Sequence, residues 1–123
     1  GLRLLIDAQS DMQVVAEAGN GRVAIQRAVE LHPTVVVLDV SMPELNGLDA
    51  TRELRQVAPD AAIVALTRYD DDAYVREIMS AGASGYVLKQ SRPAELLHAV
   101  RSVASGGKYL DASMTAPVIG RTR

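Results

Sequence analysis

The sequence contains no cysteine, and this absence excludes two kinds of chemistry. Neither a disulfide framework nor a reactive thiolate is available to the chain. Long apolar runs are also lacking, because no stretch approaches the roughly 18 residues of a membrane-spanning helix. The sequence shows neither a signal peptide nor an initiator methionine, so we expect a cytoplasmic protein whose natural chain begins upstream of Gly1.

Charge of one sign is not concentrated anywhere along the chain. The 13 basic and 15 acidic residues give a net charge of -2, and neither sign forms a long run. A nucleic-acid-binding surface normally shows a basic stripe, so we expect no DNA binding by this stretch itself. With 123 residues and 48% hydrophobic content, the chain has enough apolar material for one core and one domain.

Strand-like and helix-like patterns alternate along the chain. The spacing of apolar residues predicts strands at 12–18, 34–39, 61–67 and 84–88. It predicts helices at 21–32, 47–58, 71–82 and 93–105, and Leu2, Leu5 and Ile6 indicate that the chain opens in a helix. Because strands joined by helices pair in parallel through right-handed crossovers, we expect an α/β fold with an open parallel sheet and helices on both faces.

Polar residues stand where three of these predicted strands end. Asp39 and Thr67 are the last residues of their strands, and Lys89 follows the strand at 84–88. The carboxyl ends of parallel strands share one edge of the sheet, which is where ligands bind in open α/β folds. A carboxylate nucleophile, a hydroxyl and an ammonium at this edge favour phosphoryl transfer, which depends on positioning and charge neutralisation.

Three segments together resemble a known family. TVVVLDVSMPELNG (34–47), IVALT (63–67) and AGASGYVLK (81–89) are similar to the receiver domain of two-component response regulators. The similarity is to the branch whose receivers precede a helix-turn-helix DNA-binding domain in nitrate-type and LuxR-type regulators. It covers roughly residues 1–110 and implies a flavodoxin-like, CheY-like fold. Residues 111–123 would begin a linker toward a DNA-binding domain that the sequence does not contain.

The resemblance implies a role for each residue at the predicted edge. Asp39 would accept a phosphoryl group from the phosphohistidine of a sensor histidine kinase, and Lys89 would pair with the phosphoryl oxygens. The hydroxyl of Thr67 would move onto one of these oxygens while the ring of Tyr86 moves inward, which makes a two-state switch. The protein would act as a homodimer and would catalyse only its own phosphorylation and dephosphorylation. It would control transcription through the output domain.

The resemblance also implies a Mg²⁺ ion bound by Asp39 and the backbone carbonyl of Ser41. The acidic pair that closes the family's first strand is missing, because Gly1 aligns within the family's first helix. Two ligands make a poor Mg²⁺ site, since the ion demands nearly octahedral oxygen coordination. The missing strand would lie between 12–18 and 34–39, and its absence leaves two edges to be satisfied by exchange with another chain or by local disorder.

Two other interpretations of the sequence stay open. Gly19, Gly21 and Ala24 satisfy the G-x-G-x-x-A pattern of a dinucleotide-binding loop, and Asp39 lies 20 residues after Gly19, as a ribose-binding acid would. Against this, polar residues within 12–18 suit a half-exposed strand rather than the buried strand that such a loop follows. The second alternative is a receiver-like domain that binds partners and never takes a phosphoryl group.

Several acidic residues have a structural explanation that needs no ligand. Asp70, Asp71 and Asp72 are adjacent and could suggest a metal site. Acids that open a helix more often cap its first turn and complement its dipole. Taken singly, Asp39, Thr67 and Lys89 also have such explanations, as a turn residue, a strand-end residue and a solvated lysine. The functional hypothesis therefore depends on the three residues lying together at one edge of the sheet.

Overall fold

Four parallel strands form one sheet in the order β1-β2-β3-β4 in the computed structural model, which describes residues 2–41 and 46–114. The strands are β1 (Val35–Asp39), β2 (Ala62–Thr67), β3 (Gly85–Leu88) and β4 (Tyr109–Leu110). The helices are α1 (Leu2–Asp7), α2 (Gly21–Leu31), α3 (Gly47–Val57), α4 (Asp72–Ala81) and α5 (Pro93–Ala104). The predicted parallel α/β architecture is confirmed, and β1 to β3 match the strands predicted at 34–39, 61–67 and 84–88.

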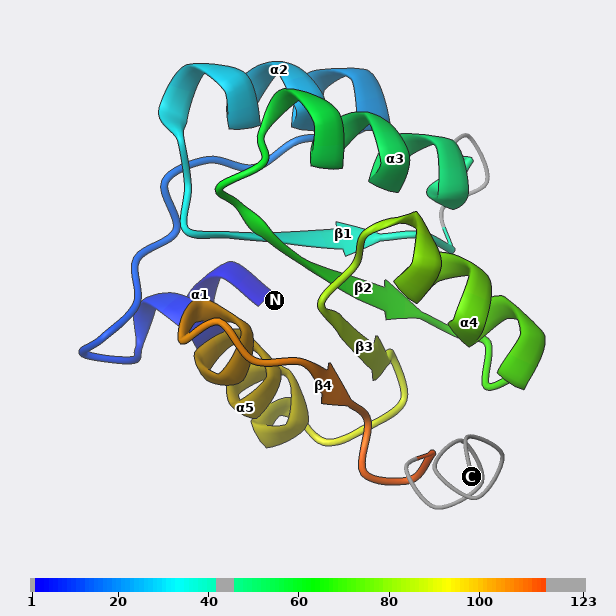
Figure 1. Ribbon diagram of the computed structural model, residues 1–123. Coiled ribbons are helices and arrows are strands. Elements are labelled where there is room, and N and C mark those ends of the chain that lie inside the picture. Colours follow the sequence, from blue (N-terminus) through cyan, green and yellow to red (C-terminus); the bar gives the residue numbers. More distant parts are fainter. Residues whose placement is uncertain (1, 42–45, 115–123) are drawn as a thin grey trace.

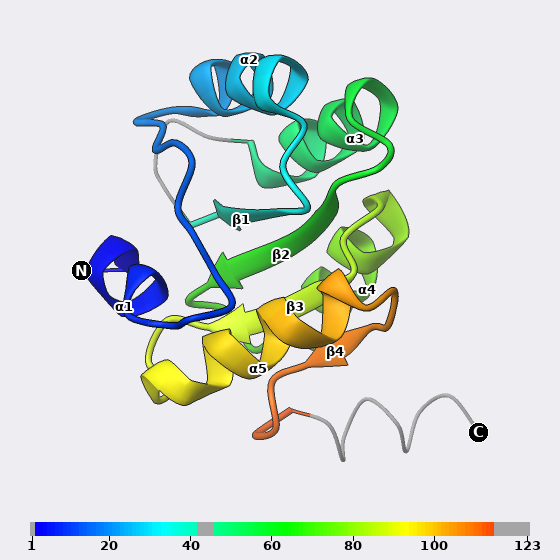
Figure 2. The same ribbon diagram turned by 90° about the vertical axis from the view of Figure 1, so that its left-hand side faces the viewer.

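Helices cover both faces of the sheet because alternate strand residues point to opposite sides. On one face, Leu38, Ile63 and Ala65 pack in a core with residues of α2, α3 and α4. On the other face, Val64 and Leu66 pack against α5. Figures 1 and 2 show these layers, with α2 to α4 on one side of the strands and α5 on the other. The central strand β2 is almost completely buried, as its unbroken apolar sequence requires.

Side-chain caps define where the helices begin. Asn20 accepts a hydrogen bond from the amide of Val23 and starts α2. Asp71 accepts one from the amide of Ala73 and starts α4, so the acids at 70–72 open a helix as expected. At the other end of α4, Gly82 has φ +127, a conformation that favours glycine. These caps place the helix ends within a residue or two of the predicted ones.

The strand predicted at 12–18 is wrong, since these residues form no strand in the structure. The segment is extended, but it has no neighbouring strand with which to pair, and a strand requires a hydrogen-bonded partner. Side-chain contacts hold it instead: the carboxylate of Asp7 accepts a hydrogen bond from the amide of Val14 at 2.8 Å, and Arg3 pairs with Glu17 at 3.0 Å. Apolar and polar residues do alternate along 12–18, but the strand pairing that usually accompanies this alternation is absent.

A hollow of about 990 Å³ separates the segment at 11–18 from β1. The carbonyl of Thr34 and the amide of Val40 both bond to β2, and in a parallel ladder alternate residues direct both backbone groups to the same neighbour. The backbone amides and carbonyls of the alternate β1 residues, Val35, Val37 and Asp39, therefore point away from β2 and toward the hollow. This hollow lies where the sequence predicted a missing strand between 12–18 and 34–39, and β1 is an edge strand as a result.

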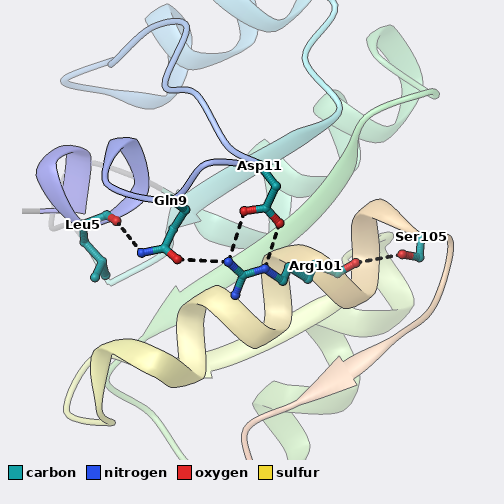
Figure 3. Close-up of polar contacts among 5 residues, drawn as sticks. All are labelled: Leu5, Gln9, Asp11, Arg101 and Ser105. Atoms are coloured by element: carbon teal, nitrogen blue, oxygen red, sulfur yellow. Dashed lines mark hydrogen bonds and ion pairs between the residues drawn. The ribbon is translucent and has the colours of Figure 1, made fainter.

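Arg101 of α5 holds the turn after α1 in place beside the hollow. Its guanidinium donates to both carboxylate oxygens of Asp11, at 2.9 and 3.1 Å, and to the side chain of Gln9 at 3.0 Å. Gln9 in turn donates to the carbonyl of Leu5 at the end of this chain of contacts (Figure 3). A planar guanidinium suits a two-pronged contact of this kind, so α1 is tied to α5 through side chains.

The chain remains packed against the domain beyond residue 110. Tyr109 and Leu110 form the short strand β4 beside β3, which the sequence did not predict. Asp111 and Met114 are then 1% and 5% exposed. Residues 115–123 of the expected linker lie outside the described part of the chain. Within the described ranges, no helix combines the length and the apolar character needed to cross a membrane.

Candidate functional site at the carboxyl edge of the sheet

The three polar residues predicted to share one edge of the sheet all lie there. Asp39 ends β1, Thr67 ends the neighbouring β2, and Lys89 directly follows β3. The arrowheads in Figure 1 show that these strands run in the same direction. The amide of Lys89 donates to the carbonyl of Thr67 at 2.7 Å, which extends the ladder by one residue and fixes where the Lys89 side chain begins.

Asp39 and Lys89 are in direct contact although they are far apart in the sequence. The ammonium of Lys89 lies 2.8 Å from Oδ2 of Asp39, and the two side chains are 31% and 27% exposed respectively. The other carboxylate oxygen, Oδ1, accepts hydrogen bonds from the amide and the hydroxyl of Ser41, at 3.1 and 2.8 Å. The carboxylate is thus held in one orientation at the surface, where a reactant can approach it.

These contacts keep Asp39 ionised. Burial by itself raises the pKa of the Asp39 carboxyl, but the hydrogen bonds from Lys89 and Ser41 outweigh it and hold the pKa below its ordinary value. Near neutral pH the group is therefore a carboxylate with a cation beside it. This is the arrangement that a carboxylate nucleophile needs when it attacks an anionic phosphoryl group, because the cation offsets the repulsion between the two.

Thr67 is fully buried at this edge, and its hydroxyl oxygen accepts a hydrogen bond from the amide of Tyr69 at 3.0 Å. The hydroxyl of Tyr86 donates to the carbonyl of the same Tyr69, and the side chain of Thr67 is close enough to Tyr86 to lower its pKa. The structure therefore brings together the two residues predicted to form the switch. Both contacts lie one strand away from Asp39, so a movement of the Thr67 hydroxyl toward a group on Asp39 would alter the surroundings of Tyr86.

The ring of Tyr86 is already inside the protein in this structure. Its side chain is 0% exposed and packs in the core between the sheet and α4, and its hydroxyl donates to the carbonyl of Tyr69 at 2.7 Å. The inward movement expected from the sequence is therefore not required from this conformation. Burial raises the pKa of Tyr86 to about 12, although the neighbouring side chain of Thr67 acts in the opposite direction.

Replacing Tyr86 by phenylalanine tests this buried hydroxyl. Loss of the bond to the Tyr69 carbonyl should lower the free energy of unfolding by about 1 kcal/mol. The raised pKa means that the tyrosine's contribution is fully present below about pH 10 and is lost as the pH rises toward 12. Urea unfolding at several alkaline pH values should therefore show a smaller loss of stability in Tyr86→Phe than in the wild type. An identical pH dependence in both proteins would contradict the assignment.

The described residues do not complete a Mg²⁺ site. Asp39 and the carbonyl of Ser41 can supply two oxygen ligands, whereas Mg²⁺ takes about six in octahedral geometry. Both carboxylate oxygens of Asp39 already accept hydrogen bonds, from Lys89 and from Ser41. Among residues 2–41 and 46–114, no group of three or more histidine or acidic side chains is placed to hold a metal ion. The donor set present here does not fit the ion by itself.

The structure does not support the dinucleotide-binding interpretation. Such a loop follows a strand, and the residues before Gly19 form none. Asn20 is the N-cap of α2 and Gly21 is the first residue of the helix, so both have a structural role. Asp39 is engaged by Lys89, as described above. The pattern of glycines is explained by the start of α2.

Sequence reasoning missed one residue at this edge, Asp111. It directly follows β4, and its buried carboxylate accepts hydrogen bonds from the amide of Leu88 and the hydroxyl of Ser91, on either side of Lys89. The signal was present, because Tyr109, Leu110 and Asp111 repeat the pattern of an apolar run that ends in a polar residue. Two apolar residues are too short a run to predict a strand, so the sequence alone assigns this carboxylate to the linker.

The family model for the response regulator receiver domain matches residues 1–101 of the chain. The fold is that of a receiver domain, and the chain belongs to this family.

Individual proteins agree with this assignment. The chain is 35% identical over 123 residues to the transcriptional regulatory protein DegU of Brevibacillus brevis, covering 100% of this chain and 52% of that protein. It is 39% identical over 120 residues to the oxygen regulatory protein NreC of Staphylococcus epidermidis, covering 97% and 55%. The chain thus spans about half the length of these relatives. A LuxR-family two-component response regulator from Aurantimonas sp. has a solved structure with a TM-score of 0.90 and 33% identity, covering 98% of this chain and 86% of that one.

Proposed function

We propose that this receiver domain is a phosphorylation-dependent switch that accepts a phosphoryl group on Asp39. The observation that carries the proposal is the contact of 2.8 Å between the Lys89 ammonium and the Asp39 carboxylate at the carboxyl edge of the sheet. A carboxylate oxygen of Asp39 attacks phosphorus, and a new O–P bond forms as the P–N bond of the kinase's phosphohistidine breaks. The imidazole leaves with the electron pair of that bond. The product on this chain is an acyl phosphate.

The side chains around Asp39 have separate tasks in this reaction. Lys89 neutralises charge on the phosphoryl oxygens, and it exchanges its bond to the carboxylate for one to the phosphoryl group. Ser41 holds the other carboxylate oxygen through two hydrogen bonds and keeps the nucleophile oriented. Thr67 then bonds to a phosphoryl oxygen, and its contact with Tyr86 passes the change into the core. Attack by water on phosphorus later breaks the O–P bond, which releases inorganic phosphate and restores the carboxylate.

The partners follow from membership of the receiver family. We propose that a sensor histidine kinase supplies the phosphoryl group in the cytoplasm, and that phosphorylation shifts a balance between two conformations. The receiver, residues 1–110, is proposed to be followed by a linker and a DNA-binding output domain, in line with the transcriptional regulators to which the chain is similar. Homodimerisation is the proposed output step, with α5 as a candidate face because it borders Lys89. The chain catalyses no reaction other than its own phosphorylation and dephosphorylation.

A small acyl phosphate donor tests the proposal. Incubation with the donor, with and without Mg²⁺, should add the mass of one phosphoryl group to the protein. An acyl phosphate on aspartate survives brief acid treatment but is removed by hydroxylamine. A phosphoserine also survives acid, but it resists hydroxylamine. Absence of any label would favour a domain that only binds partners, and a label that resists hydroxylamine would exclude an acyl phosphate.

A further inference from the structure

Asp111 connects the strand that precedes Lys89 to the segment at 112–114. Its amide donates to the carbonyl of Tyr86 at 2.8 Å, which ties it to β3 through the backbone. One oxygen of its carboxylate, Oδ2, accepts hydrogen bonds from the amide of Leu88 at 3.0 Å and from the hydroxyl of Ser91. Leu88 and Ser91 lie on either side of Lys89, so this one oxygen fixes the turn that carries the lysine.

The other oxygen of the same carboxylate holds the C-terminal side. Oδ1 of Asp111 accepts hydrogen bonds from the amide and the hydroxyl of Ser113, at 3.1 and 2.8 Å. Glu95 of α5 adds a second attachment, because one of its oxygens accepts from the hydroxyl of Tyr109 and from the amide of Ala112, both at 2.6 Å. The described end of the chain is therefore fastened to the same turn and helix that border the site.

The carboxylate of Asp111 is buried, and its hydrogen bonds replace the water that it has lost. Asp111 is 1% exposed, and a buried ionised group is costly unless hydrogen bonds replace its hydration. Burial raises the pKa of the Asp111 carboxyl, but the bonds from Ser91, Leu88 and Ser113 outweigh it and hold the pKa below its ordinary value. The group is ionised near neutral pH, and both of its oxygens accept hydrogen bonds.

Lys89 is fixed from two directions as a consequence. Its own amide donates to the carbonyl of Thr67, and the residue before it donates to Asp111. Because the backbone of Lys89 is fixed, only rotations within its side chain bring the ammonium to Asp39, at 2.8 Å. A displacement of the turn at 88–91 changes the distance between the Lys89 ammonium and Asp39. It also displaces the carboxylate of Asp111, which is hydrogen-bonded to Ser113.

We propose that Asp111 is a positioning residue that holds Lys89 against Asp39 and couples the site to the segment at 112–114 that follows β4. The first part of this proposal, that Asp111 positions Lys89, rests on the hydrogen-bond geometry alone. The coupling half rests on the proposed function: when Lys89 moves from the carboxylate to a phosphoryl oxygen, the turn at 88–91 shifts and Asp111 transmits the shift to Ser113.

Amide hydrogen exchange tests the positioning half without any phosphodonor. Asp111→Asn keeps the shape of the side chain but places an NH₂ group against hydrogen-bond donors. Exchange at the amides of Leu88 and Lys89 should accelerate by about tenfold or more, because a bond to a charged acceptor is lost. The amide of Val40, which bonds to Leu66 of β2, should exchange as in the wild type. Unchanged exchange at Leu88 and Lys89, or equal acceleration at Val40, would overturn the positioning role.

Two less disruptive variants test the link from Ser113 through Asp111 to Leu88, and they remain usable if Asp111→Asn fails to fold. Ser113→Ala removes one donor to the carboxylate on the C-terminal side, and it should accelerate exchange at Leu88 by about threefold. Ser105→Ala is the matched control, because among residues 2–41 and 46–114 its hydroxyl bonds to the carbonyl of Arg101 at the end of α5 and not to Asp111. The same exchange at Leu88 in both variants would show that Asp111 does not transmit changes between the two segments.

Phosphorylation kinetics distinguish this role from a general loss of stability. Asp111→Asn should slow labelling by the acyl phosphate donor about tenfold, but it should add no further slowing to Lys89→Ala, because it acts through the lysine. Equal slowing in both backgrounds would contradict positioning. If the wild type takes no label, the proposed function fails, while the exchange measurements still decide whether Asp111 positions Lys89.

Discussion

Replacing Asp39 by asparagine should abolish formation of the acyl phosphate. The amide has no carboxylate oxygen that can attack phosphorus, and its NH₂ group would face either the Lys89 ammonium or the donors of Ser41. The fold should survive, because the side chain is partly exposed and its contacts lie at the surface. Intact mass measured after incubation with the small acyl phosphate donor should show one added phosphoryl group in the wild type and none in the variant.

The matched control for this experiment is Asp70→Asn. Asp70 is an exposed acid that follows β2, the strand next to Asp39, and it takes no part in the proposed reaction. This variant should take up the label as the wild type does. Persistent labelling of Asp39→Asn would remove Asp39 from its role, and loss of labelling in Asp70→Asn would indicate that a different acid accepts the phosphoryl group.

Lys89→Ala should slow phosphorylation about a hundredfold, the usual effect of removing a positioned charge from a site where negative charge develops. The free energy of unfolding should change by less than about 1 kcal/mol, because the pair with Asp39 is partly exposed and water screens it. The rate of labelling and a urea unfolding curve, measured on the same preparations, separate the two effects. A variant that is slow but stable identifies Lys89 as part of the chemistry.

Lys108 provides the control, since it is the only other lysine in the chain and lies exposed just before β4. Lys108→Ala should label at the wild-type rate. If both lysine variants label equally fast, the contact between Lys89 and Asp39 is an ordinary surface ion pair. A large loss of stability in Lys89→Ala alone would point to a structural role for the same contact.

The candidate site was predictable from the sequence because of one rule about parallel sheets. Asp39, Thr67 and Lys89 each stand where an apolar strand ends, and parallel strands end at the same edge. The strands themselves were recognisable because burial on both faces requires an unbroken apolar run, which a sequence shows plainly. The lysine's contact with Asp39 follows from the order of the strands and from the length of the side chain.

The segment at 12–18 could not be assigned correctly for a physical reason. Alternation of apolar and polar residues reports which way side chains point, but pairing depends on a neighbour elsewhere in the chain. Here the segment at 11–18 and β1 lie on opposite sides of a hollow of about 990 Å³, so the alternation has no ladder to accompany it.

The state of the switch and the role of Asp111 were also beyond the sequence. Whether Tyr86 lies inside or outside depends on how the core packs around Thr67 and α4, and a single aromatic residue carries no information about that. β4 has only two residues, and its pairing with β3 is a long-range contact. Asp111 therefore looked like a linker residue, although its hydrogen bonds join both sides of the site.

Trapping of the acyl phosphate with borohydride tests the central claim most directly. Hydride reduces the phosphorylated aspartate to homoserine and releases phosphate, and peptide mass spectrometry then identifies the converted position. The arrangement of Lys89 and Ser41 around one carboxylate predicts homoserine at position 39 and at no other acidic residue. Homoserine at a different position, or full labelling with no conversion at position 39, would contradict it.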